Sequence, residues 1–150
     1  MKIRAIQPED KAVWQHLWRG YIEFYKANIP APQDDLTWRR LLDPDYELHG
    51  LIAEKDGVAL GITHYSFQTS TWAPKNYFYL EDLFVDPQSR GQGLGRALID
   101  AVKEIAISAG SRRLYWNTDS TNETARKLYD SYTNESGKVQ YRIALTAIDE

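Results

Sequence analysis

The spacing of apolar residues in the first third of the chain predicts a short strand followed by two helices. Apolar and polar residues alternate over residues 2–6, as in a strand with one buried face. Apolar side chains then recur at spacings of four, four and three, which predicts an amphipathic helix with a stripe of Val13, Leu17, Tyr21 and Phe24. A break with two prolines at residues 28–32 ends this helix, and Asp34 is expected to cap a second, shorter one.

The middle of the chain has the pattern of strands that lead into a long helix. Residues 48–69 read as two strands joined by Asp56-Gly57, the two-residue signal for a tight hairpin. Residues 76–85 are almost continuously apolar, which is typical of a strand buried on both faces. The apolar stripe in residues 93–109 predicts the clearest helix of the chain.

The last third continues the alternation of strands and helices. Residues 113–117 read as a strand, residues 121–130 as a short helix, and residues 139–144 as a final strand. This order predicts a mixed α/β fold around one sheet, in a single domain that covers residues 1–150.

Composition and charge exclude several classes of function. The formal net charge of −3 is unlike the basic excess of nucleic-acid-binding proteins. The chain has no cysteine, which excludes disulfides, thiolate metal sites and a cysteine nucleophile. The three histidines, His16, His49 and His64, lack the spacing of metal ligands, so we expect no metal site. The chain has no signal peptide or membrane-spanning segment, so we expect a cytoplasmic protein with no membrane partner.

A glycine-rich turn between the strand at 76–85 and the long helix is suited to binding phosphate. Its sequence is Arg90-Gly91-Gln92-Gly93-Leu94-Gly95. The first backbone N–H groups of a helix have no partner within the helix, and glycine lets a phosphate approach them closely. The turn lacks the spacing of the dinucleotide fingerprint and the Lys-Ser/Thr pair of the Walker loop. The alternative is a glycine-rich connection that binds no ligand.

Two segments resemble the GNAT superfamily of N-acetyltransferases. The first runs from Tyr79-Leu80-Glu81-Asp82-Leu83-Phe84-Val85 through the glycine-rich turn to Leu98. The second has Tyr115-Trp116 on a strand, followed by Asn122, Ala125, Leu128 and Tyr129. The first is similar to the diamine acetyltransferases, and the second to the yeast histone and polyamine acetyltransferases. The chain departs from the family after Tyr129, where Asp130-Ser131-Tyr132 follows and the nearest glycine is Gly137.

The resemblance implies a fold, a cofactor and a reaction. The fold is a mixed, mostly antiparallel sheet with a splayed pair of strands and helices on both faces. The cofactor is acetyl-CoA, whose pantetheine arm lies in the splayed opening, and the acetyl group moves directly to an amine in a ternary complex. The residues expected to bind the cofactor are Leu83, Phe84, Val85, Arg90, Gly91, Gln92, Gly93, Leu94, Gly95, Arg96, Asn122 and Arg126.

Acetyl transfer to an amine needs a group that takes the proton of the ammonium and benefits from one that protonates the leaving thiolate. Tyr129 shares a helix face with Asn122 and is the candidate acid, the alternative being a tyrosine packed in the core. Glu81 interrupts an apolar strand and is the candidate base, acting directly or through water, the alternative being an ion pair with a nearby Arg or Lys. Its neighbour Asp82 is expected to point to the opposite face of the strand.

The acceptor is expected to be a small cationic amine, polyamine-like or amino-acid-like, because the N-terminal helices combine carboxylates with aromatic rings. The candidate contacts are Glu23, Tyr25, Asp34, Asp35 and Trp38. The alternative for each is an ordinary acidic surface. Protein lysine or N-terminal acetylation and a non-catalytic acyl-CoA-binding module stay open as other functions. The exposed aromatic residues permit a homodimer.

Overall fold

The computed structural model describes residues 1–146, which group into two compact units. The first unit is Met1–Trp116, and the second begins at Asn117. The first unit contains five strands, β1 (Lys2–Ala5), β2 (Leu48–Lys55), β3 (Val58–Gln68), β4 (Tyr77–Val85) and β5 (Leu114–Tyr115). Its helices are η1 (Pro8–Asp10), α1 (Lys11–Phe24), α2 (Ala31–Leu42), η2 (Pro87–Ser89) and α3 (Leu94–Ser108). No helix in residues 1–146 is both long enough and apolar enough to cross a bilayer.

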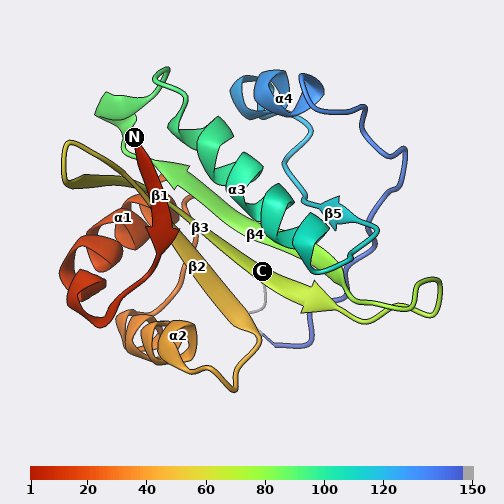
Figure 1. The fold of residues 1–150 in the computed structure, drawn as a ribbon, viewed down its shortest axis with the longest axis horizontal. Coiled ribbons are helices and arrows are strands. Elements are labelled where there is room, and N and C mark those ends of the chain that lie inside the picture. The colour runs from red at the N-terminus through yellow and green to blue at the C-terminus, as the bar shows by residue number, and fades with distance from the viewer. Residues whose placement is uncertain (147–150) are drawn as a thin grey trace. The chain divides into compact units, whose positions relative to one another are not determined.

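The five strands form one sheet in the order β1-β2-β3-β4-β5 (Figure 1). The pairs β1–β2, β2–β3 and β3–β4 are antiparallel, and β5 pairs with β4 in parallel. That parallel pairing covers only Phe78 with Leu114 and Tyr79 with Tyr115, although β4 continues to Val85. The sheet therefore opens between β4 and β5 after Tyr79. This confirms the mixed, mostly antiparallel sheet that the sequence predicted.

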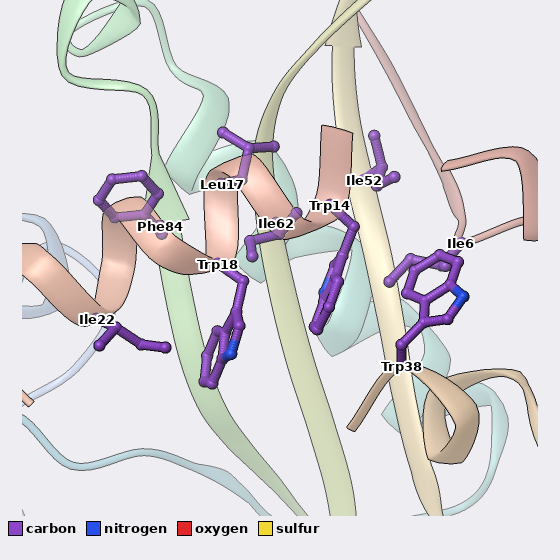
Figure 2. Packing of buried hydrophobic residues seen from close by; sticks show 9 residues of the cluster. All are labelled: Ile6, Trp14, Leu17, Trp18, Ile22, Trp38, Ile52, Ile62 and Phe84. Carbon is purple, nitrogen blue, oxygen red and sulfur yellow. The ribbon is translucent and has the colours of Figure 1, made fainter. Parts of the chain in front are cut away.

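Helices cover both faces of the sheet (Figure 1). On one face α1 and α2 enclose an apolar cluster with the strands, which Figure 2 shows from close by. On the other face α3 packs against β3, where Leu98 lies 3.3 Å from the position that a Cβ on Gly61 would take. The absence of a side chain at Gly61 thus lets α3 lie close to the sheet.

The buried face of α1 differs from the predicted stripe. Its fully buried residues are Trp14, Leu17, Trp18 and Ile22. Phe24, which was expected in the stripe, is half exposed. The buried face is wider than a single row of every third or fourth residue, because two tryptophans on the same face each cover a large area of sheet.

The hairpin and the second helix agree with the sequence in place but not in every detail. Asp56 and Gly57 both have positive φ, at 53° and 79°, as a tight hairpin turn of the predicted kind requires. The α2 helix begins after Pro30 as its N-cap, so the prediction that Asp34 caps it is wrong. Asp34 lies one turn further in and is buried.

The second unit contains one helix, α4 (Glu123–Asp130), and no strand among its described residues. The predicted final strand at residues 139–144 is therefore wrong. Alternating apolar residues Val139, Tyr141 and Ile143 supply the period of a strand, but all three are exposed and no residue of the stretch 139–144 belongs to a strand or a bridge. A strand is stabilised by cross-strand pairs, which the period alone does not provide.

Candidate active site

The opening of the sheet exposes one side of the β4 backbone. After Tyr79 no strand of the described residues pairs with β4 on the side away from β3. Leu83 and Val85 are half-buried in this stretch, whereas the Phe84 side chain is buried in the core beneath α1. Phe84 can therefore reach a ligand only through its backbone.

The register of β3 and β4 shifts where the opening begins. Tyr65 pairs with Leu80 and His64 pairs with Asp82, so Glu81 has no partner across the ladder. Such an extra residue is a β-bulge, which re-aims side chains locally. Leu80 accordingly lies opposite Tyr65 on the α3 face, and Asp82 lies opposite His64 on the α1 face. Strict alternation of the side chains is thus broken at Glu81, which the sequence analysis did not foresee.

Glu81 is solvent-exposed at this bulge, yet its carboxyl is surrounded by enough protein to change its acidity. Desolvation is the main cause that raises the pKa of Glu81, and the negative charge of Asp82 adds to it. His64 acts in the opposite direction. Within residues 1–146 Glu81 makes no salt bridge with Lys or Arg, so the ion-pair alternative is not observed. A carboxylate of raised pKa that solvent can reach is suited to accepting a proton.

Next to Glu81, a chain of hydrogen bonds connects α1, β3 and β4. The Trp14 indole Nε1 donates to His64 Nε2 at 3.0 Å, and His64 Nδ1 lies 2.9 Å from Asp82 Oδ2. Tyr21 on α1 lies close enough to Asp82 for the charge of that carboxylate to act on its hydroxyl. Burial is the main cause that raises the pKa of Tyr21 well above its usual value, and Asp82 adds to it.

This hydrogen-bonded group was not predicted from the sequence. His64 was expected not to bind a metal and was given no other role, and Tyr21 was expected to be a core residue. The available signal was that His64 and Asp82 are polar residues within two otherwise apolar strands. Their pairing depends on the bulge at Glu81, which no local pattern in the sequence reveals.

The glycine-rich turn has the geometry expected of a phosphate-binding loop. Gly91 and Gly93 have positive φ of 79° and 83°, and Gly93 is the N-cap of α3. No heavy atom lies within 4 Å of the position that a Cβ would take on either glycine, so the backbone there is open to a ligand. The first N–H groups of α3 have no partner within the helix, and the helix dipole makes this end attractive to an anion. The residues present therefore fit a diphosphate.

The side chains of the turn differ in their contacts and in their burial. Arg90 lies over the Phe24 ring, with 4.7 Å between its guanidinium carbon and the ring centroid, and its Nε donates to the Val85 carbonyl at 3.2 Å. Gln92 accepts a hydrogen bond from Lys55 Nζ at 2.9 Å. Leu94 is buried, so only its backbone can meet a ligand. Gly95 and Arg96 lie in the first turn of α3, where Arg96 is exposed.

The predicted residues of the second unit lie on or beside α4. Asn122 is the N-cap of α4, and its Oδ1 accepts a hydrogen bond from the Ala125 backbone at 3.2 Å. Arg126 donates to the Ser120 carbonyl at 2.8 Å and to Glu135 at 2.6 Å. Tyr129 lies in the last turn of α4 and is half-buried.

The predicted amine contacts divide into surface residues and core residues. Glu23, Tyr25 and Asp35 are exposed, with Asp35 at 3.3 Å from Lys11 Nζ in an ion pair. Asp34 is 1% exposed and is held by Arg19 and Trp18, so its carboxylate is not free for an amine. Trp38 is buried against Trp14, with ring centroids 5.1 Å apart. We therefore withdraw Asp34 and Trp38 from the set of amine contacts.

No group of three or more His, Asp or Glu side chains within residues 1–146 is placed to hold a metal ion.

Comparisons with known proteins place this arrangement in a family. The family model described as "Acetyltransferase (GNAT) family" matches residues 11–132. The D-amino-acid N-acetyltransferase HPA3 of Saccharomyces cerevisiae is 34% identical over 142 residues, covering 93% of this chain and 88% of its own. A thialysine N-epsilon-acetyltransferase of Caenorhabditis elegans is 32% identical over 108 residues, covering 69% of this chain and 67% of its own.

A solved structure confirms the fold. It is AAC(6')-Iy in complex with the bisubstrate analog CoA-S-monomethyl-acetylneamine, with a TM-score of 0.83 and 23% identity, covering 97% of this chain and 98% of that chain. The family match spans the opened sheet, the glycine-rich turn and α4. The chain therefore belongs to the acetyltransferase (GNAT) family and is an N-acetyltransferase.

Proposed function

We propose that this N-acetyltransferase uses acetyl-CoA to acetylate the primary amine of a small cationic acceptor, either polyamine-like or amino-acid-like. The observation that carries the proposal is the course of β4, which leaves β5 after Tyr79 and leads through open glycines of positive φ to the N-terminus of α3. The named activities of the relatives, on D-amino acids and on thialysine, support a small amine as acceptor.

The residues around the opening would hold the cofactor. The backbone of residues 83–85 offers hydrogen-bonding groups on the unpaired side of β4. The N–H groups from Gly93 to Arg96 would bind the diphosphate, with Arg90 beside them. Bound in this way, acetyl-CoA supplies the acetyl group as a reactive thioester.

Glu81 acts as the base in this proposal. An alkylammonium has a pKa of about 10.4, so at neutral pH the acceptor must lose a proton before its nitrogen can attack. Glu81 is exposed at the bulge, and its raised pKa brings its proton affinity closer to the working pH. Its carboxylate takes the proton of the ammonium directly or through one water molecule.

Tyr129 acts as the acid in this proposal, passing a proton from its Oη to the departing sulfur. The family resemblance supports this role, as does the position of Tyr129 on the same face of α4 as Asn122, the cap of that helix. Asn122 and Arg126 keep their proposed cofactor roles. The family match covers both compact units, which supports one functional domain. The homodimer and the cytoplasmic location stay predictions from the sequence.

A thiol-release assay with acetyl-CoA and a panel of amines tests the proposal. The panel contains spermidine, D- and L-lysine, thialysine, and peptides with a free N-terminus or an internal lysine. We expect turnover with small cationic amines, at a kcat/KM at least about tenfold above that for any peptide, a preference of about 1.4 kcal/mol. Turnover confined to peptides would assign the enzyme to protein acetylation. Binding of acetyl-CoA without turnover on any amine would indicate a non-catalytic acyl-CoA-binding module.

A further inference from the structure

Hydrogen bonds fix the orientation of the His64 ring. The indole N–H of Trp14 can only donate, so His64 Nε2 accepts at 3.0 Å. On the other side of the ring, Nδ1 donates to Asp82 at 2.9 Å. Both the Trp14 and His64 rings are almost completely buried. Trp14 and Asp82 thus hold the imidazole between them.

Asp82 is therefore anchored by His64. It accepts a hydrogen bond from His64 Nδ1. Within residues 1–146 no lysine or arginine forms a salt bridge with Asp82, and its side chain is only 13% exposed. A hydrogen bond in such a buried network holds the carboxylate in position.

This anchored carboxylate directly follows the bulged residue. Asp82 is tied to β3 through His64, and His64 is tied to α1 through Trp14, so the chain is held immediately after Glu81. We propose that Asp82 is a positioning residue that, held by His64, fixes the bulge and presents Glu81 to the acceptor amine. The inference rests on the proposed role of Glu81 as the base.

The charges around Glu81 give this role a measurable consequence. The titratable groups that act on Glu81 within the first unit are Asp82 on β4, His64 on β3 and Tyr21 on α1. The negative charge of Asp82 raises the pKa of Glu81, and His64 acts in the opposite direction. Removing the charge of Asp82 must therefore lower the pKa of Glu81. In wild type the proton-accepting form of Glu81 is lost as the pH falls through its raised pKa, and without the Asp82 charge this loss moves to lower pH.

The test compares wild type with Asp82→Asn, using Asp45→Asn in an exposed turn as the matched control. Carbon-13 NMR of the Glu81 carboxyl follows its titration in the protein alone. We expect Asp82→Asn to move that titration to lower pH, and the acid limb of kcat/KM for the best amine of the panel to move with it. Misplacement of Glu81 should also lower kcat about 10- to 100-fold, with the KM of acetyl-CoA little changed. Asp45→Asn should change nothing.

The outcomes separate this inference from the proposed function. Full activity of Glu81→Gln would overturn the role of Glu81 as base and this inference with it. An inactive Glu81→Gln together with an unchanged Glu81 titration and kcat in Asp82→Asn would overturn the inference alone. Nitrogen-15 NMR of His64 in wild type gives a second test, which decides should Asp82→Asn fail to fold. A proton on Nδ1 is expected, and an Nδ1 without a proton would overturn the inference.

Discussion

Asp34 and Asp82 are both largely buried carboxylates, and their partners give them different properties. Asp34 accepts from Arg19 Nε at 2.6 Å, so a positive charge balances it. Asp82 is held by the imidazole of His64 and makes no salt bridge with lysine or arginine within residues 1–146. A carboxylate paired with a guanidinium is costly to leave without its partner, whereas Asp82 acts electrostatically on its neighbour Glu81. The partners of each residue, more than its residue type, therefore decide its role here.

A single substitution also tests the proposed role of Tyr129 as the acid. Tyr129→Phe removes only the hydroxyl that would protonate the departing sulfur, and it keeps the aromatic ring. We expect kcat to fall about 10²- to 10⁴-fold, the usual contribution of a general acid, while the dissociation constant of acetyl-CoA changes little. Steady-state kinetics combined with calorimetric binding measures both quantities. Equal losses in turnover and affinity would mark Tyr129 as a binding or packing residue.

At the scale of elements, the contact between α1 and α2 depends on one carboxylate. Asp34 on α2 accepts from Trp18 Nε1 at 3.2 Å and from Arg19, both on α1. The pair is partly screened by solvent, because the Arg19 side chain is 37% exposed.

We expect Asp34→Ala to lower the free energy of unfolding by roughly 2 kcal/mol, because it leaves the Trp18 indole and the Arg19 guanidinium without their acceptor. Urea denaturation measures this loss, and the KM of the amine should stay the same. Asp35→Ala, one position along the same helix at an exposed site, is the matched control for stability. A raised amine KM in Asp34→Ala without loss of stability would return Asp34 to the substrate site.

The elements also divide into those that local sequence determines and those that it does not. The hairpin at Asp56-Gly57 and the helix after Gly93 follow from turn chemistry and from a repeating apolar stripe, which are local properties. The bulge at Glu81 depends on how β3 and β4 pair, and the strand expected at residues 139–144 needed a partner that its own sequence cannot supply. The buried face of α1 differs from the predicted stripe because its two tryptophans bury more surface than the smaller apolar residues on which the prediction was based.

At the scale of the whole molecule, the opened sheet unites most of the candidate site. Leu83, Val85 and Glu81 lie on β4 beyond its last pair with β5, and the same strand leads to the glycine-rich turn. The sequence alone could suggest this segment because its glycines and carboxylates are close together along the chain. The hydrogen-bonded group of Trp14, His64 and Asp82 could not be identified in this way, because its members are brought together only by the fold.

Acetyl-CoA is proposed to bind through the backbone at the start of α3, and two glycines allow a matched test. Gly93 and Gly57 have nearly the same φ, 83° and 79°, and a Cβ on either would meet no heavy atom within 4 Å. Alanine should therefore strain both positions equally, by roughly 1–2 kcal/mol, but only Gly93 precedes the first turn of α3, whose N–H groups have no partner within the helix.

Calorimetric titration of acetyl-CoA into wild type, Gly57→Ala and Gly93→Ala is the most direct measurement. We expect wild type and Gly57→Ala to bind alike and Gly93→Ala to bind about 10- to 100-fold more weakly, as for the loss of one hydrogen bond to a charged group. An absence of binding heat in wild type, or equal affinities in all three proteins, would contradict the account.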